Sequence, residues 1–340
     1  MSATAVPLHL RLIGALRKLP REALLTCLPL FRIIVPISIV TRLLQQWGVV
    51  DQIGMLLGPL MHLVGLPGEI GLVWATAMVT NLYAGMVVFA SLAPGLHLSV
   101  AQVTVLTTMM LVAHALPVEL RIAQKAGTRF RTQILLRVGG ALLLGALLNL
   151  LYRLSGTLQQ ANTALWSPPP ADPTWSGWLM DQLYNLASIF LIVLSLMTLL
   201  KLLKGMGFID LITRLLEPLL ALLGMSRQVA PLTIVGMTLG LSYGGGLIIR
   251  EAGSGHLERR DIFSSIALLG LCHSLIEDSL LMMVLGGHVS GVLWGRLVFA
   301  LLVVFLLCRL LRLMPPTLLE RYFVRPAPLA GASPAEVRCC

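Results

Sequence analysis

Long apolar stretches constrain this chain more than any other feature, because they decide the solvent in which it folds. A segment needs about 20 consecutive apolar residues to cross the hydrocarbon core of a bilayer. Stretches of that length occupy residues 23–46, 69–92, 101–120, 132–152, 179–200, 229–249, 262–285 and 291–312. Charged residues make up only 12% of the 340 residues, too few for the surface of a soluble protein of this size. We therefore expect an all-α integral membrane protein whose helices contact the lipid bilayer.

The chain also repeats itself at a spacing of 159 residues. The paired positions are Gly48 with Gly207, Asp51 with Asp210, Pro59 with Pro218, Gly65 with Gly224, His114 with His273, Glu119 with Asp278, and Arg137 with Arg296; a one-residue slip pairs Tyr83 with Tyr243 and Gly85 with Gly245. Apolar pairings alone would mean little between two hydrophobic halves. Polar, glycine and proline residues that match in order indicate an internal repeat.

A stretch rich in proline and tryptophan separates the two halves. The chain is therefore predicted to have five parts: an N-terminal lead (1–22), a first transmembrane repeat (23–153), an extracytoplasmic linker (154–178), a second transmembrane repeat (179–312) and a C-terminal tail (313–340). Two shorter amphipathic stretches, 51–66 and 210–225, contain Pro59 and Pro218, which we expect to break them. Each shorter stretch either crosses the membrane as a fifth segment of its half or forms a re-entrant arm.

The distribution of basic residues favours ten crossings. With five segments in each half, the basic cluster at 121–131 and both termini face the cytoplasm, and the outer loops hold only Arg153 and Arg227. The net charge of +10 then reflects membrane orientation, and we expect no nucleic-acid partner. An odd number of segments per half makes the halves antiparallel. The predicted fold is thus a helical bundle of about ten spanning segments, built as two inverted repeats in the cell inner membrane.

Titratable residues inside apolar stretches are the strongest functional signal. His114 and His273 lie at matching depths, followed by Glu119 in one half and by Glu277 and Asp278 in the other. Such groups are costly in a bilayer and usually face a partner or a wet cavity. Histidine with carboxylate suits a proton relay or a divalent cation. The alternative is that each imidazole is structural and bonds a neighbouring carbonyl.

Three of these residues carry local expectations. His273 and Glu277 are four residues apart, so we expect them to share one helix face. Pro117 should kink its helix and redirect Glu119. If the site binds a metal ion, the candidate ligands are His114, Glu119, His273 and Glu277.

A second polar group lies near the glycine-rich part of each half. It comprises Asn81 and Tyr83 in the first half, and Ser242, Tyr243, Gly244 and Gly245 in the second. Either the glycines break a helix and expose backbone groups to a ligand, or they form a close packing seam. Arg32 lies well inside an apolar stretch and is expected to pair with a carboxylate or an anionic substrate. Arg137 and Arg296 are expected to snorkel to the interfaces.

The motif Gly236-Met-Thr-Leu-Gly-Leu-Ser-Tyr-Gly-Gly-Gly246, a charged loop and the sequence His273-Ser-Leu-Ile-Glu277-Asp278 carry a family resemblance. The chain resembles the nucleoside-recognition, or Gate, membrane proteins over residues 23–150 and 179–312. That family is akin to spore-maturation proteins and to the permease part of bacterial ferrous-iron transporters. The iron permease has a cysteine in its glycine-rich segment, where this chain has Gly245 and Gly246. The resemblance implies a membrane permease fold.

These features predict a secondary transporter or permease with a site for a small solute or ion between the two repeats. Coupling would come from protonation of the histidine and carboxylate groups or from a bound cation. A divalent metal transporter or exporter is one alternative, and a non-transporting assembly or signalling protein is another. No nucleophile–base pair is visible, so we expect no enzyme. The sequence leaves open the substrate, any cofactor and association with a second copy.

Overall fold

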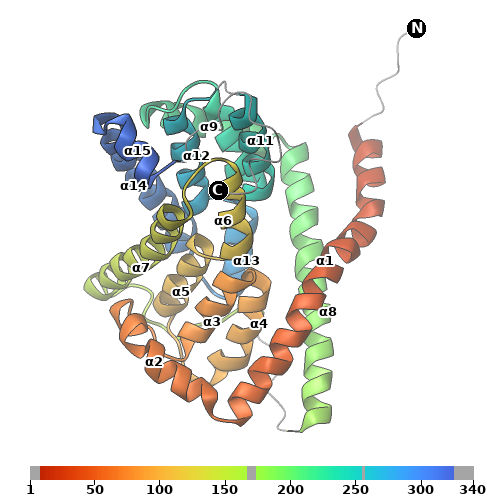
Figure 1. Ribbon diagram of the computed structural model, residues 1–340. Helices are drawn as coiled ribbons and strands as arrows, with labels where there is room; N and C mark the ends of the chain where they lie inside the picture. The colour runs from red at the N-terminus through yellow and green to blue at the C-terminus, as the bar shows by residue number, and fades with distance from the viewer. Residues whose placement is uncertain (1–7, 167–173, 255–256, 325–340) are drawn as a thin grey trace, which may run out of the picture.

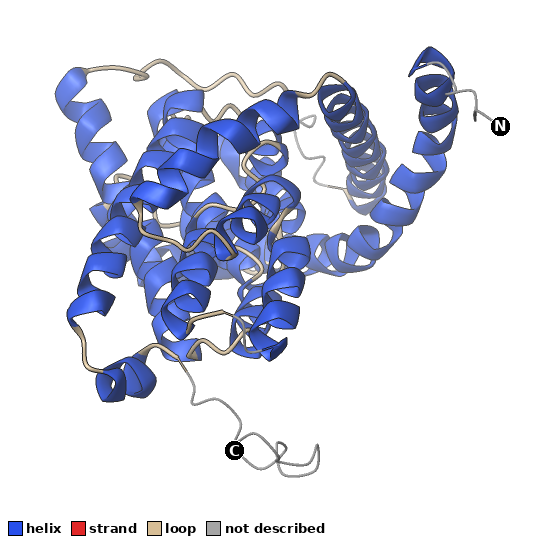
Figure 2. Cartoon of the chain, turned by 90° about the horizontal axis from the view of Figure 1, so that it is seen from above, coloured by secondary structure: helices blue, strands red, loops and turns tan. Residues whose placement is uncertain are grey.

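The computed structural model describes residues 8–166, 174–254 and 257–324, and helices are the only extended secondary structure in those ranges (Figures 1 and 2). In chain order they are α1 (Leu8–Gln46), α2 (Val49–Leu63), α3 (Ile70–Val79), α4 (Leu82–Leu92), η1 (Ala93–Gly95), α5 (Val100–Val112), α6 (Leu116–Lys125), α7 (Phe130–Ser155), α8 (Trp175–Gly205), α9 (Phe208–Leu222), α10 (Val229–Leu239), α11 (Leu241–Ser254), α12 (Arg259–Leu271), α13 (Glu277–Val284), η2 (Ser290–Gly295), α14 (Arg296–Leu313) and α15 (Pro316–Tyr322). The predicted all-α class is confirmed.

The long helices α1 and α8 pack side by side along one flank of the molecule (Figure 1). Buried Cys27 and Ile34 of α1 join Val87 of α4 and Ile189 and Val193 of α8 in a small apolar cluster. The short helices that follow, α2 and α9, lie at opposite ends of the molecule (Figure 1). The two short helices, which the repeat pairs with each other, therefore lie at opposite ends of the molecule.

Paired glycines mark the ends of these two short helices. Gly48 precedes α2 with φ 67°, and Gly207 precedes α9 with φ 74°. Gly65 and Gly224, which follow the same helices, have φ 75° and 81°. A left-handed conformation strains any residue with a Cβ, so a chain that makes these turns favours glycine. The expectation that proline breaks both stretches is wrong, because Pro59 and Pro218 lie inside continuous helices.

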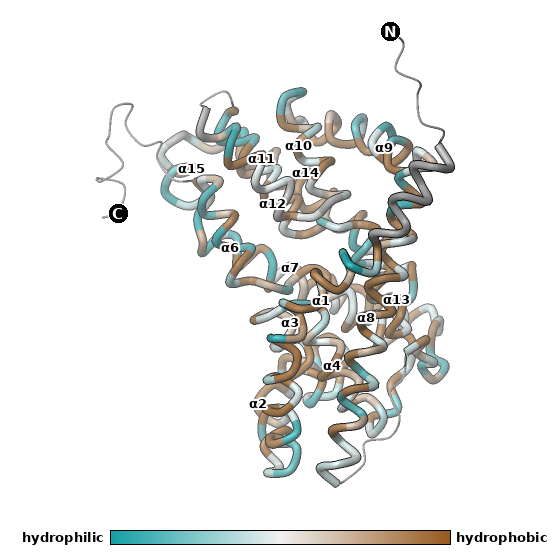
Figure 3. Tube along the Cα trace, turned by 90° about the vertical axis from the view of Figure 1, so that its right-hand side faces the viewer, coloured by the Kyte–Doolittle hydropathy of each residue, from teal (hydrophilic) through white to brown (hydrophobic). Residues whose placement is uncertain are grey.

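Five helical stretches of the described residues are long and apolar enough to cross a membrane: Leu19–Gln46, Val100–Lys125, Phe130–Ser155, Trp175–Gly205 and Ser290–Leu313. Further apolar helices are shorter. Hydrophobic residues dominate most of the chain trace, whereas hydrophilic residues are more frequent along α6 and α15 (Figure 3). On α14, four exposed apolar residues recur every fourth position: Val298, Leu302, Leu306 and Leu310. Such a stripe suits contact with lipid tails.

Four stretches that the sequence presents as continuous spans are each divided into two helices. The stretch 69–92 is interrupted between α3 and α4, where the side chain of Asn81 accepts a hydrogen bond from the Ala84 amide at 2.9 Å. The stretch 229–249 is interrupted at Gly240, whose φ is 96°. The stretches 101–120 and 262–285 are interrupted at the two histidines. Apolar composition sets the length of a stretch but does not reveal a break within it.

The glycine run of α11 forms a packing seam and does not break the helix. A Cβ on Gly244 would lie 2.2 Å from the Cα of Gly236 in α10, whereas a Cβ on Gly246 would meet nothing within 4 Å. We expect Gly244→Ala to lower the free energy of unfolding by about 1–3 kcal/mol, because the two backbones must separate. Gly246→Ala should raise it by about 0.5–1 kcal/mol, because alanine favours a helix interior. Thermal unfolding in detergent measures both, and equal effects would contradict the seam.

Residues 156–166, which lie within the predicted linker 154–178, pack against the rest of the protein. The Val100 amide donates to the Gln160 carbonyl at 3.0 Å, and the Asn162 amide donates to the Leu98 carbonyl at 2.9 Å. The Leu165 amide reaches the Val284 carbonyl at 3.0 Å. This segment therefore ties the loop before α5 to the end of α13.

Candidate functional site

His114 lies in a helix break. Helix α5 ends at Val112 and α6 begins at Leu116, with Ala115 in the left-handed region at φ 47°. Pro117 stands in the first turn of α6, where its missing N–H costs no helical hydrogen bond. The imidazole Nδ1 of His114 lies 3.0 Å from the Met110 carbonyl oxygen. The break therefore directs the other ring nitrogen, Nε2, away from its own helix.

His273 lies in an equivalent break of the second half. Helix α12 ends at Leu271 and α13 begins at Glu277, with Ser274 in the left-handed region at φ 45°. The imidazole Nδ1 of His273 lies 2.7 Å from the Leu269 carbonyl oxygen. Both breaks thus hold a histidine with the same ring nitrogen tied to the carbonyl four residues earlier.

Two buried arginines bind the backbone carbonyls at these breaks. Arg137 of α7 donates from Nε to the Val112 carbonyl at 3.0 Å and from Nη2 to the His114 carbonyl at 3.1 Å. Arg296 of α14 donates from Nε to the Leu271 carbonyl at 3.1 Å and from Nη2 to the His273 carbonyl at 2.5 Å. These carbonyls have lost their helical partners, so each guanidinium stabilises one break.

The expectation that both arginines snorkel to the interfaces is wrong. The exposed fraction of Arg137 is 2% and that of Arg296 is 0%. A buried guanidinium is tolerated only when acceptors surround it, and the break supplies them. Arg137 and Arg296 are 159 residues apart, as His114 and His273 are, and that shared spacing is the signal that could have linked the arginines to the site.

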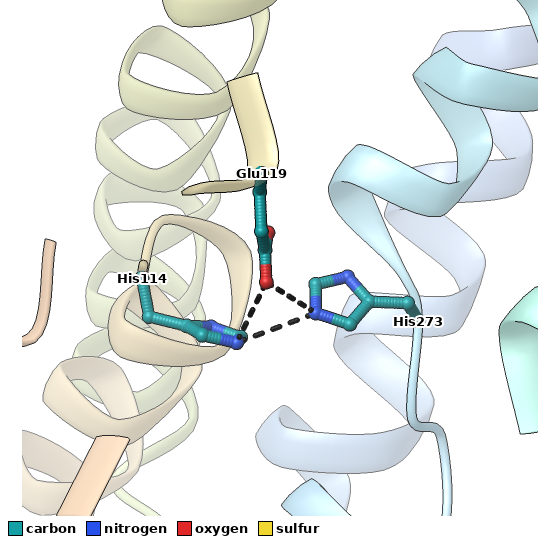
Figure 4. A group of neighbouring side chains, drawn as sticks. All are labelled: His114, Glu119 and His273. Carbon is teal, nitrogen blue, oxygen red and sulfur yellow. Dashed lines mark hydrogen bonds and ion pairs between the residues drawn. The ribbon is translucent and has the colours of Figure 1, made fainter. Parts of the chain in front are cut away.

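The two breaks meet, and three side chains converge between them (Figure 4). His114 Nε2 and His273 Nε2 are 3.3 Å apart. Glu119 Oε1 lies 3.4 Å from His114 Nε2 and 3.2 Å from His273 Nε2. All three residues are buried. We refer to His114, Glu119 and His273 as the central triad.

The acidic residues of the two halves are paired differently. Glu119 uses its second oxygen, Oε2, for an ion pair with Arg137 Nη1. Asp278 occupies the corresponding position, but its Oδ2 lies 3.9 Å from His114 Nε2. The Nη1 of Arg296 is buried without a hydrogen-bond partner in the part of the chain that the structure describes. The site is therefore built from matching residues yet is not symmetric in its contacts.

Comparison with known proteins places the chain in a family. Residues 27–128, which include His114 and Glu119, match the family model described as nucleoside recognition (Gate). The chain is also 30% identical over 276 residues to the uncharacterized membrane protein YvoD of Bacillus subtilis (strain 168), covering 80% of this chain and 86% of that protein. The chain belongs to the nucleoside-recognition (Gate) family. It is a multi-pass membrane protein, and no solved structure gives a significant match.

In this Gate-family chain, Glu277 does not share a helix face with His273. The helix α13 begins only at Glu277, so the four-residue spacing crosses the break and the expectation is wrong. Tyr83, half-buried on α4, packs against the small apolar cluster that Cys27 and Ile34 of α1 form with α4 and α8.

The other predicted residues play local roles or lie apart. Asn81 caps α4, and Gly245 packs against Ile122 of α6, where a Cβ would come within 2.5 Å of a methyl group. Arg32 is exposed on α1 and forms no ion pair with a carboxylate of the described residues, and its expected contact with an anionic substrate stays a prediction. The side chains of Ser242 and Tyr243 lie outside the described part of the structure.

Proposed function

We propose that this Gate-family chain is a secondary transporter or permease, with its binding site at the central triad. The observation that carries the proposal is the meeting of two broken helices at buried titratable side chains. Broken helices at a repeat interface offer backbone and side-chain groups to a substrate or ion in many secondary transporters. A purely structural histidine needs one hydrogen-bond partner, whereas each imidazole here keeps a second nitrogen turned toward the other half.

The energetic cost of the site supports a functional role. A charged group at the centre of a bilayer costs about 2.5–3.5 kcal/mol or more, and such groups usually mark pathways for substrates or ions. This region holds Glu119, Asp278, Arg137 and Arg296 together with both histidines. Helix packing alone is achieved more cheaply by apolar side chains.

We also propose the inverted arrangement for the two halves, with ten membrane segments and both termini in the cytoplasm of an inner-membrane protein. The opposite positions of α2 and α9 and the recurrence of site contacts at a 159-residue spacing support it. The basic residues Arg121, Lys125, Arg129 and Arg131, from the end of α6 to the start of α7, support the orientation.

Cysteine labelling tests this topology. In a chain whose Cys339 and Cys340 are replaced by serine, we expect a membrane-impermeant thiol reagent applied outside to modify Gln160→Cys but not Lys125→Cys, both exposed positions. Permeabilised membranes should allow both reactions, which controls for reactivity. Labelling of Lys125→Cys in intact cells would contradict the proposed orientation.

Transport is tested by reconstitution after a ligand screen. Purified protein is heated with nucleosides, divalent metal ions or small anions, because a ligand that binds only the folded state raises the unfolding midpoint. We expect one class to stabilise the protein and to enter proteoliposomes that contain it. A chain that binds none of these classes and moves none of them fits the non-transporting alternative instead.

A further inference from the structure

The central triad presents three hydrogen-bond acceptors to one another. A backbone carbonyl only accepts, so the Nδ1 atoms bonded to Met110 and Leu269 must carry the protons. A neutral imidazole with a protonated Nδ1 has a bare lone pair at Nε2. The Oε1 of ionised Glu119 is also an acceptor. Three lone pairs within 3.4 Å of one another repel unless a cation lies among them.

The spacing of these atoms fits one tetrahedral metal ion. The three separations are 3.3, 3.4 and 3.2 Å, nearly an equilateral triangle. Zinc binds histidine nitrogen and carboxylate oxygen at about 2.0–2.2 Å, and a tetrahedron with such bonds has edges of about 3.3–3.6 Å. One proton would bridge a single edge and leave acceptors facing each other along the other two. The geometry therefore favours a metal ion over a proton.

We infer that the central triad binds one divalent transition-metal ion of the zinc type through His114 Nε2, His273 Nε2 and Glu119 Oε1. Two histidines and one glutamate are a known zinc ligand set that leaves a position open. The claim that the triad binds this ion depends on the geometry alone. The further claim that the ion is transported rests on the proposed function.

The surroundings of the triad match those of metal-binding side chains. Ligating histidines usually donate their other ring N–H to a carbonyl, as both do here. Arg137 fixes the second oxygen of Glu119. Asp278 lies just outside the triad, with its Oδ2 3.9 Å from His114 Nε2. The charges of Arg137 and Arg296 lower the affinity for a divalent cation, and the carboxylate of Asp278 beside His114 opposes that effect.

The test uses Co²⁺ as a spectroscopic probe on the purified full-length protein after treatment with a chelator. We expect one equivalent of Co²⁺ to give the intense visible absorption of a tetrahedral site, and one equivalent of Zn²⁺ to abolish it. The wild-type spectrum decides the question even if variants fold poorly. A weak octahedral spectrum, or no bound metal, overturns the site.

Variants assign the ligands. His114→Ala, His273→Ala and Glu119→Gln should each weaken Co²⁺ binding by at least about 100-fold, the upper end of what loss of an outer-shell partner costs. His62→Ala, an exposed histidine on α2, should bind as the wild type does. Full binding by both site histidine variants overturns the assignment. Metal binding without uptake of any solute in proteoliposomes would leave the site standing and refute the transport function. Uptake of another solute without metal binding would support the transport function and overturn the metal site.

Discussion

Replacing Arg137 by methionine is expected to lower the free energy of unfolding by about 3–5 kcal/mol, the cost of removing one partner of a buried ion pair. The change leaves the carboxylate of Glu119 buried without its cation and leaves the Val112 and His114 carbonyls without donors. Methionine fills much of the same volume, so the loss reports charge and hydrogen bonding more than packing. Denaturant or thermal unfolding in detergent, followed by tryptophan fluorescence, measures it.

Two other arginine variants are compared with Arg137→Met, the first as a control and the second as a test of the asymmetry between the halves. Arg131→Met, at an exposed position of the same helix, should change the free energy by no more than about 0.5 kcal/mol. Arg296→Met should cost less than Arg137→Met, because Arg296 binds two carbonyls but has no ion pair among the described residues. A larger loss at position 296 than at 137 would contradict the asymmetric pairing of the two halves.

Replacing His273 by alanine is expected to weaken binding of the stabilising ligand by about 2–5 kcal/mol, the usual cost of truncating a buried, charge-paired contact. His273 supplies Nε2 to the triad, and alanine removes it without adding a charge. The readout is the ligand-dependent rise in unfolding midpoint, together with uptake into proteoliposomes at matched protein content. Uptake should fall in parallel with binding.

The control for His273→Ala is Met282→Leu, a volume-conserving change at a fully buried position of α13. It should preserve both binding and uptake. If His273→Ala also behaved as the wild type does between about pH 5 and 8, where histidine titrates, the histidine would be structural. Helix packing would then be the better account of the site.

The sequence predicted the structure best at paired positions where one physical requirement, such as a left-handed turn, explains why the same residue type occurs in both halves. Gly48 and Gly207 matched at the 159-residue spacing, and both proved to make left-handed turns before short helices. The spacing also paired His114 with His273, and the structure brings these residues together. Family membership, predicted from the glycine-rich motif and the segment beginning at His273, is confirmed by the match to the Gate family and by the Bacillus relative.

The break at His273 could not be predicted, because nothing local in the sequence requires it. The second histidine break contains Cys272, Ser274 and Ile276, with neither glycine nor proline. It is stabilised by Arg296, which lies more than 20 residues later, so the signal is tertiary. The run Gly244–Gly246 drew attention instead, yet it does not break its helix, and Gly244 is needed for the close approach of α10. The expectation that His273 and Glu277 share a helix face failed for the same reason, since helical spacing was applied across a break.

The claim that both halves contribute to one site is tested most directly by a double-variant cycle on His114 and His273. Ligand affinity is measured by calorimetry for the wild type, for each alanine variant and for the double variant. If the two imidazoles hold the same ligand, each single change removes most of the affinity, and the double variant is little weaker than either one. Losses that add independently, or a single variant that binds as the wild type does, would contradict a shared site.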